Sequence, residues 1–322
     1  MTDERFRDRK IQFSNGVVGR PIEIASANPL NYHQLVSAPG EMPKMTIDGQ
    51  LFLPLRRGGA VPLVIVVPGS LSVAPSHLAH AGTLNALGFA SFVLDPFGGR
   101  GVTSTVANQT QFSFAASAHD VMAAVRALAA LPEIDAQRIG LQGHSRGGSA
   151  VLAAVMRRLS ARVLPNGPQV RAVLAAYPWC GHQPLDPDVG GCEVRVLIGD
   201  QDDWVSPQQA QGFVQAIRLR GAVASIRIFA GAEHSFDREE PVHEIPEAAV
   251  SPAAPTAYLA DDGSFIHPAT GIADPALVDR DLAVYALKAG YGQKGATIGT
   301  RGAQAQAFRD DMKAFFARTL GG

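Results

Sequence analysis

A serine lies in the glycine-rich stretch LQGHSRGGSA, with a glycine two residues before Ser145 and another two residues after it. A short apolar run at 138–143 precedes the serine, and an alanine- and valine-rich helical stretch at 149–161 follows it. A nucleophile on a sharp strand-to-helix turn has a strained backbone, and residues beside it must lack a Cβ where backbones approach closely. The alternative is a tight structural turn. The flanking strand and helix favour Ser145 as a nucleophile that attacks a carbonyl group.

A serine hydroxyl needs a base to take its proton, and the chain contains 9 histidines. His234 lies in the stretch IFAGAEHSFD, just past the predicted strand at 225–231. Loops at the carboxyl ends of parallel strands are where an open α/β sheet collects its chemistry. His234 is therefore the candidate base. Structural roles are favoured for three histidines on predicted helices and for the one beside the serine, which are His77, His80, His119 and His144.

A histidine base needs an acid that fixes its tautomer and stabilises the imidazolium. The stretch LIGDQDDWVSP includes the end of the predicted strand at 193–200 and offers Asp200, Asp202 and Asp203, of which only one can face the imidazole. The nucleophile, the acid and the base then follow one another as serine, aspartate and histidine, the order expected of α/β-hydrolases. Three such side chains at three strand ends predict a catalytic triad.

Attack on a carbonyl group also requires hydrogen-bond donors for the developing oxyanion. One predicted donor is the backbone amide of Arg146, the residue after the nucleophile. The other is expected from VVPGSLSVAP, the segment that ends the first strand of the parallel series and begins the loop after it. Within this loop the amide of Leu71 is favoured and that of Ser70 is the alternative.

The elements that position these residues alternate between short apolar strands and longer helices. The expected strands cover 61–69, 89–97, 138–143, 170–178, 193–200 and 225–231, and the expected helices cover 77–88, 115–132, 149–161, 207–221 and 305–320. The last helix has an apolar face at i, i+4, i+7 and i+8, formed by Phe308, Met312, Phe315 and Phe316. Continuously apolar strands joined by helical crossovers indicate an α/β fold, with a mostly parallel twisted sheet covered by helices on both faces.

Residues 1–60 are expected to add antiparallel strands, within 11–26 and 45–55, to one edge of this sheet. Residues 238–301 interrupt the alternation, because this stretch carries six prolines and few apolar runs around one predicted helix at 276–290. About 60 residues between the last strand and the last helix exceed an ordinary connection. We expect this excursion to pack over a single domain that spans 1–322.

The composition narrows the range of partners. Charged residues make up 18% of the chain and its formal net charge is -1, so neither nucleic acid nor an anionic membrane is expected as a partner. The N-terminal stretch is charged and lacks the apolar region of a signal peptide, and no run is long enough to span a membrane, so a cytoplasmic location is expected. No metal or cofactor is expected. The oligomeric state, a homodimer included, is left open.

The two cysteines are expected to be free thiols. Cys180 follows the carboxyl end of one predicted parallel strand, and Cys192 precedes the amino end of the next. Those ends lie a strand length apart, roughly 17 Å for five residues, which is far beyond the reach of a disulfide.

Several stretches resemble the dienelactone hydrolase family of the α/β-hydrolase fold. DPFGGRG at 95–101, GHSRGG at 143–148 and GAEHSFD around His234 are similar to that family. In the family the acid is the fourth residue of a Gly-x-x-Asp stretch, so the resemblance points to Asp202. The dienelactone hydrolases proper use a cysteine nucleophile where this chain has Ser145. The resemblance therefore implies the fold and the triad geometry but not lactone specificity.

The resulting hypothesis is a serine hydrolase that acts on carboxylic esters or lactones through an acyl-enzyme. A peptidase or amidase, an acyltransferase and a non-catalytic binding module are the alternatives. The substrate pocket is expected to include residues that follow strand ends, namely Phe97, Arg100, Trp179 and Trp204. Arg100 could bind a substrate carboxylate. The competing prediction for Arg100 is a structural ion pair with an acid in the excursion.

Overall fold

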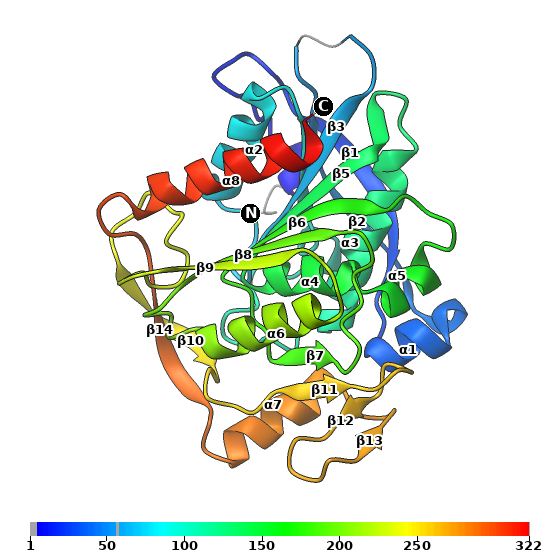
Figure 1. The fold of residues 1–322 in the computed structure, drawn as a ribbon, viewed down its shortest axis with the longest axis vertical. Coiled ribbons are helices and arrows are strands. Elements are labelled where there is room, and N and C mark those ends of the chain that lie inside the picture. The colour runs from blue at the N-terminus through cyan, green and yellow to red at the C-terminus, as the bar shows by residue number, and fades with distance from the viewer. Residues whose placement is uncertain (1–4, 56–57, 322) are drawn as a thin grey trace.

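The computed structural model describes residues 5–55 and 58–321, and an eight-stranded sheet lies at its centre (Figure 1). The strand order is β1-β2-β4-β3-β5-β6-β8-β9. Neighbouring strands from β4 to β9 are parallel, whereas β1 and β2 extend the β4 edge in antiparallel pairs, as predicted. The bounds are Arg20–Ala27 (β1), Lys44–Phe52 (β2), Val61–Val67 (β3), Ala90–Asp95 (β4), Ile134–His144 (β5), Val170–Ala176 (β6), Glu193–Gly199 (β8) and Ala224–Phe229 (β9).

Helices cover both faces of the sheet. Two helices, α2 and α8, contact each other on one face, and α3 and α4 contact each other on the opposite face (Figure 1). The helix α6 packs against β8 and β9. Burial on both faces explains why every residue of β4 is buried and why this strand has no polar-apolar alternation. The helices are Tyr32–Ser37 (α1), Pro75–Ala86 (α2), Phe114–Ala129 (α3), Arg146–Ala154 (α4), Arg157–Val163 (α5), Pro207–Leu219 (α6), Asp279–Lys288 (α7) and Gln304–Leu320 (α8).

The last helix, α8, is amphipathic as predicted. The four side chains of its expected apolar face are all buried, namely Phe308, Met312, Phe315 and Phe316. The helix contacts β5, β6 and β8 as well as α2, so that it closes one face of the sheet. Both cysteines are free and buried, which confirms the prediction made from the strand ends.

One predicted helix is wrong in its extent. The stretch 149–161 forms two helices, because α4 ends at Ala154 and α5 begins at Arg157. Between them Met156 has an extended backbone and a buried side chain, and the amide of Arg157 donates to the carbonyl of Asp188. This tertiary hydrogen bond takes the place of the helical hydrogen bond of the Arg157 amide. The periodicity of the local sequence does not reveal such a tertiary contact.

The excursion at 238–301 contains the helix α7 and most strands of two small sheets. One sheet pairs β10 (His243–Val250) with β14 (Gln293–Ile298). The other has the order β13-β12-β11-β7. Its strand β7 (His182–Pro184) follows β6 and pairs in parallel with β11, so the excursion is joined to the central part of the chain. The remaining elements are Ala257–Leu259 (β11), Phe265–Ile266 (β12), Ala273–Asp274 (β13) and the 3-10 turns Phe6–Asp8, Pro39–Glu41 and Gly98–Arg100.

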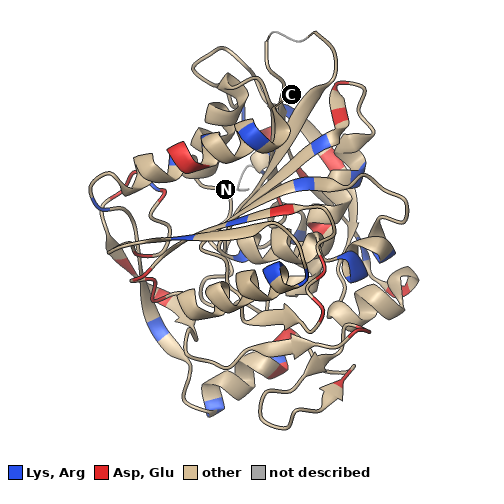
Figure 2. Ribbon diagram, in the orientation of Figure 1, with Lys and Arg blue, Asp and Glu red and all other residues tan. Residues whose placement is uncertain are grey.

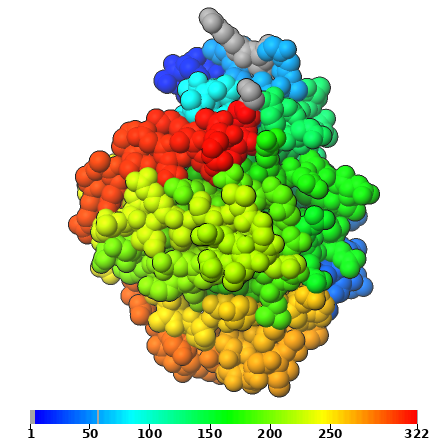
Figure 3. All heavy atoms as spheres, viewed as in Figure 1, coloured from blue at the N-terminus to red at the C-terminus, as the bar shows by residue number. Residues whose placement is uncertain are grey.

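The excursion forms a continuous layer at one end of the molecule. In the space-filling view its yellow and orange residues gather at the bottom and lower left, next to the green residues of the central part (Figure 3). Lys and Arg are interspersed with Asp and Glu over the ribbon, in keeping with the small net charge (Figure 2). Among the helices of the described residues, none has the length and apolar character needed to cross a bilayer.

Candidate active site

Ser145 lies at the sharp turn between β5 and α4. Its φ of 54° and ψ of -118° are unusual for a residue with a side chain, and its amide donates to the carbonyl of Ala176. A Cβ on Gly143 would lie 2.1 Å from the carbonyl oxygen of Gly147, and a Cβ on Gly147 would lie 2.4 Å from that of Val67. The two glycines are therefore required by backbone contacts, which is the physical basis of the motif.

Three side chains from separate strand ends form a hydrogen-bonded series. Ser145 Oγ lies 2.9 Å from His234 Nε2, and His234 Nδ1 lies 2.8 Å from Asp202 Oδ2. Because a carboxylate only accepts, Nδ1–H donates to Asp202, and Nε2 is left to accept the serine proton. All three residues are buried, with exposed fractions of 7%, 2% and 7% for Ser145, His234 and Asp202. The arrangement has the geometry of a nucleophile, a base and an orienting acid.

Of the three aspartates after β8, the structure places Asp202, to which the family resemblance points, against the base. Only Asp202 contacts His234, and its second oxygen accepts the amides of Trp204 and Val205 at 3.0 Å each. Asp200 accepts the amide of Gly231. Asp203 accepts the amide and the hydroxyl of Thr297, so it anchors the excursion instead. The ring of Trp204 also stacks on His234, with centroids 5.1 Å apart.

The loop after β3 lies directly against the nucleophile. A Cβ on Gly69 would approach the Cβ of Ser145 to 3.0 Å, so the backbone of this loop passes close to the reacting hydroxyl. A large cavity and a small cavity both reach Ser145. Ser70 lines the two of them, whereas Leu71 lines only the small one. The predicted donor loop is therefore next to Ser145, and α4 begins at Arg146 on the other side.

A cavity of about 800 Å³ lies between the nucleophile and the excursion. Ser145, Trp179 and Trp204 line it from the central part of the chain, and α7 and β10 contribute most of the opposite wall. The two tryptophans thus lie where the pocket prediction expected them. The lining contributed by the excursion includes Ala249, Val250, Leu282, Ala283, Ala286 and Leu287.

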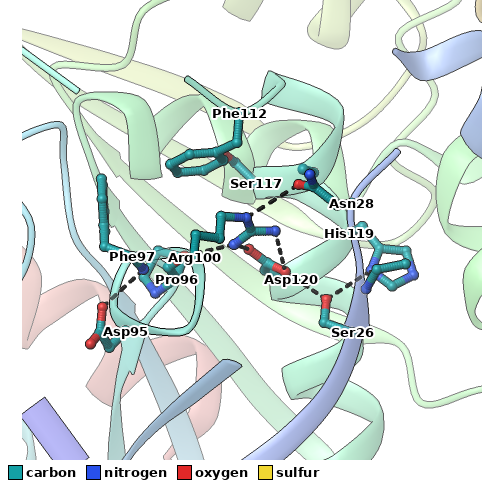
Figure 4. Close-up of polar contacts among 12 residues, drawn as sticks. Ser26, Asn28, Asp95, Pro96, Phe97, Arg100, Phe112, Ser117, His119 and Asp120 are labelled. Atoms are coloured by element: carbon teal, nitrogen blue, oxygen red, sulfur yellow. Dashed lines mark hydrogen bonds and ion pairs between the residues drawn. The ribbon is translucent and has the colours of Figure 1, made fainter. Parts of the chain in front are cut away.

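Phe97 and Arg100 are not among the residues that line this cavity, and the pocket prediction is corrected for both. Phe97 is buried, and its ring packs edge-on against Phe112 at 5.4 Å. The Arg100 guanidinium forms an ion pair with Asp120 at 2.6 Å and donates to Asn28 and to the carbonyl of Pro96 (Figure 4).

The partner predicted for Arg100 is therefore also wrong, since Asp120 belongs to α3 and not to the excursion. Asp120 also accepts a hydrogen bond from Ser26, whose hydroxyl lies 3.0 Å from Nδ1 of His119 (Figure 4). The network joins the loop after β4, α3 and β1. It explains why Arg100 is held within the protein and does not line the cavity.

The histidines for which structural roles were favoured contact other protein groups. His80 donates to Asp237 at 2.7 Å, and the hydroxyl of Tyr177 donates to the same carboxylate at 2.6 Å. His144 lies 2.9 Å from that hydroxyl and points away from the nucleophile beside it. Burial lowers the pKa of His144 to about 3 and that of His77 well below its usual value, so both are neutral near pH 7.

Asp237 is a buried acid that the reading of the sequence missed. Although burial alone would raise the pKa of Asp237, hydrogen bonds and nearby histidines hold it well below the usual range. His80, His144 and Asp237 place their ligand atoms within 4.8 Å of one another and are the one group among the described residues that could hold a metal ion. The two oxygens of Asp237 already accept from His80 and Tyr177, whereas the buried Nδ1 of His80 has no hydrogen-bond partner among the described residues.

A second buried acid comes from the excursion. Asp279, the first residue of α7, accepts the amide of Phe114 at the start of α3 at 2.8 Å, and its other oxygen lies 3.6 Å from His182 Nδ1. Burial raises the pKa of Asp279 to about 6 and lowers that of His182 to about 3. Both residues line the large cavity. Nothing in the local sequence distinguished Asp279 from the other acids of the excursion.

Comparison with known families now identifies the class of protein. The model of the dienelactone hydrolase family matches residues 47–258, a segment that includes Ser145, Asp202 and His234. The chain therefore belongs to the dienelactone hydrolase family. A comparison with curated proteins gave no match.

Solved structures share this fold at low sequence identity. A protein assigned as a dienelactone hydrolase from Klebsiella pneumoniae subsp. pneumoniae is 15% identical with a TM-score of 0.53, and the match covers 92% of this chain and 99% of that one. A structure described as m3DLH is 17% identical with a TM-score of 0.52, covering 94% and 99%. The esterase Est22 is 17% identical with a TM-score of 0.50, covering 70% and 75%. These likenesses show the α/β-hydrolase fold.

Proposed function

We propose that this member of the family is a serine hydrolase that cleaves carboxylic esters through an acyl-enzyme on Ser145. The observation that carries the proposal is the hydrogen-bonded series from Ser145 through His234 to Asp202, with distances of 2.9 and 2.8 Å. The series lies at the ends of parallel strands and beside a cavity large enough for a substrate.

In the proposed reaction the hydroxyl of Ser145 attacks the ester carbonyl while His234 Nε2 takes the proton. The amides of Arg146 and Leu71, with Ser70 as the alternative to Leu71, hold the oxyanion of the tetrahedral intermediate. His234 then gives its proton to the leaving alcohol. Water, deprotonated by the same histidine, attacks the acyl-enzyme, and the proton passes to Ser145 Oγ as the acid is released. Asp202 holds the imidazole in the required tautomer throughout.

The proposed substrates are esters with a sizeable apolar group. Trp179, Trp204 and the small aliphatic residues of α7 and β10 give the cavity a largely apolar wall. Arg100 is paired with Asp120, and the guanidinium of Arg146 is hydrogen-bonded to protein carbonyls. Neither guanidinium is therefore free to bind a substrate carboxylate. Lactones remain within the proposed range.

The nucleophile is tested with a fluorophosphonate probe and the variant Ser145→Ala. We expect the probe to label the wild-type protein and not the variant, and ester turnover to fall by at least about 10³-fold. Labelling that survives in Ser145→Ala would contradict the assignment.

The substrate class is tested with p-nitrophenyl esters of increasing chain length, a carboxylate-bearing dienelactone and a peptide amide. We expect an ester with a longer acyl chain to have the highest kcat/KM. Faster cleavage of the amide would make the protein a peptidase, and transfer of the acyl group to added alcohols in preference to water would make it an acyltransferase.

A further inference from the structure

The side chain of Arg146, the residue after the nucleophile, is buried among protein acceptors. Its Nε donates to Ser117 Oγ at 3.1 Å, and its two terminal nitrogens donate to the carbonyls of Gln109 at 2.8 Å and Phe112 at 2.6 Å. Its guanidinium also lies over the rings of Phe112 and Phe114, at 4.4 and 4.1 Å from their centroids. Arg146 thus connects the nucleophile turn to the loop before α3.

The same loop binds the segment after β3. Ser104 Oγ and the amide of Thr105 both donate to the carbonyl of Ser70, at 3.1 and 2.9 Å. The hydroxyl of Ser70 in turn donates to Gln109 Oε1 at 2.9 Å. Residues 104–112, which we term the bridging loop, therefore lie between the guanidinium of Arg146 and the backbone of Ser70.

These contacts determine the direction of the amide proposed as an oxyanion donor. The carbonyl of Ser70 and the N–H of Leu71 belong to one peptide unit, and in a planar trans peptide they point in opposite directions. Two hydrogen bonds on the Ser70 carbonyl therefore fix where the Leu71 N–H points. If Ser70 itself is the donor, the bond from its hydroxyl to Gln109 attaches that residue to the bridging loop.

We propose that the Arg146 side chain is a positioning residue that couples the two halves of the oxyanion hole. Its own amide is one donor, and its guanidinium holds the bridging loop that orients the donor from Ser70 or Leu71. Because the contacts form one series, a change at Arg146 displaces both donors together. This inference rests on the proposed ester hydrolysis at Ser145.

The chemistry of arginine supports this role over simple packing. Burial lowers the pKa of Arg146 to about 10, so the side chain stays charged at neutral pH. Among the described residues no carboxylate forms an ion pair with it within 4.0 Å. An apolar side chain would fill the same space without a buried charge. What arginine adds is a planar fork of donors that binds two carbonyls of the bridging loop at once.

The first test compares wild type with Arg146→Met, which puts a shorter, unbranched apolar side chain in place of arginine and removes its donors. We expect kcat for a p-nitrophenyl ester to fall about 100-fold while KM changes by less than about threefold, because oxyanion contacts strengthen only in the transition state. The inhibition constant of a trifluoromethyl ketone, which forms a tetrahedral adduct with the serine, should rise by the same factor as kcat/KM falls. An unchanged inhibition constant would contradict the proposal.

A second variant keeps the proposal testable if Arg146→Met folds poorly. Ser104→Ala removes one of the two hydrogen bonds on the Ser70 carbonyl and leaves Arg146 untouched. We expect Ser104→Ala to lower kcat about tenfold alone and to have little further effect in the Arg146→Met background, since both act through one series of contacts. Additive effects of the two changes would overturn the coupling.

The control variant is Arg195→Met. Arg195 forms an ion pair with Asp311 at 2.6 Å, between β8 and α8 and outside the residues that line the large cavity. It is expected to lower stability without lowering kcat. If wild type hydrolyses no ester and takes no fluorophosphonate label, the proposed function fails. If wild type is active and Arg146→Met matches it, the proposed function stands and the role of Arg146 fails.

Discussion

At the scale of single residues, the site depends on which oxygen faces which nitrogen. Asp200, Asp202 and Asp203 lie within four positions of one another, yet only Asp202 reaches His234. Trp204 and Val205 donate their amides to the other oxygen of Asp202, so the carboxylate is held from both sides. The choice among three chemically identical side chains is therefore made by the turn that follows β8.

The role of Asp202 gives a direct prediction. Asp202→Asn keeps the shape of the side chain but removes the carboxylate that fixes the tautomer of His234, so we expect kcat to fall roughly 10³- to 10⁴-fold. Steady-state kinetics on a p-nitrophenyl ester would measure this. Asp203→Asn is the matched control, because Asp203 contacts Thr297, and it should retain most of the activity. Full activity in Asp202→Asn would assign the acid elsewhere.

At the scale of elements, α7 and the two small sheets form one wall of the cavity. The start of α7 is attached to the start of α3 through Asp279 and the amide of Phe114. Asn31 donates to the carbonyls of Pro275 and Leu277, which binds the preceding turn to the segment after β1. These contacts indicate that the position of α7, and with it the shape of the cavity, depends on a few polar interactions.

The attachment of α7 should depend on pH. Burial raises the pKa of Asp279 to about 6, above its usual value of 3.8, against the opposing effects of Phe114 and Arg146. The folded protein therefore binds this proton more tightly than the unfolded chain, and the group favours folding more as pH falls from about 6 to about 4. From pH 7.5 to 4.5, wild type should gain about 2 kcal/mol relative to Asp279→Asn.

Urea denaturation of both proteins at the two pH values would measure this difference. His182 and Tyr32 also lie near the carboxyl, so His182→Gln serves as a control for the neighbouring imidazole. Stability curves of wild type and Asp279→Asn that run parallel between pH 4.5 and 7.5 would contradict the prediction.

The wall formed by α7 should set the acyl preference. Ala283 is exposed and lines the cavity, so Ala283→Trp should fill part of the space without disturbing the core. We expect kcat/KM for a long-chain p-nitrophenyl ester to fall roughly tenfold while the value for the acetate changes little. Ala289→Trp, just past the end of α7 and outside the lining, is the control. Equal losses for both esters would argue against an acyl pocket at α7.

At the scale of the whole molecule, the sheet is stabilised by helices on both faces. Phe308 of α8 is fully buried, and its ring contacts those of His80, His144 and Phe236. The same side chain therefore closes the core and packs against the histidines beneath the nucleophile turn. A change at Phe308 is therefore expected to affect both the stability of the fold and the geometry of the site.

Truncation of this side chain should lower stability substantially. We expect Phe308→Ala to reduce the free energy of unfolding by about 3–5 kcal/mol, because the cavity left behind cannot fully close. Leu219→Ala, at a position that is 77% exposed, should change it by less than about 0.5 kcal/mol. Equilibrium unfolding in urea would compare the two. A loss below about 1 kcal/mol for Phe308→Ala would show that α8 is not part of the cooperative core.

The sequence by itself determined the fold class, the approximate strands and helices of the sheet, and the candidates Ser145 and His234. These follow from short-range patterns, since apolar periodicity and glycine spacing reflect local backbone and burial requirements. The break between α4 and α5 at Met156 was missed, because a tertiary hydrogen bond from Arg157 produces it.

Only the tertiary structure decided which groups meet across the chain. It paired Arg100 with Asp120, placed Asp237 among the histidines, and brought Asp279 to α3 across more than 160 residues. Such contacts depend on how the elements pack against one another. The residues next to each of these acids in the sequence do not distinguish it from the other acids of the chain. Loop conformation likewise placed the Arg146 side chain against the bridging loop, which no spacing of residue types could reveal.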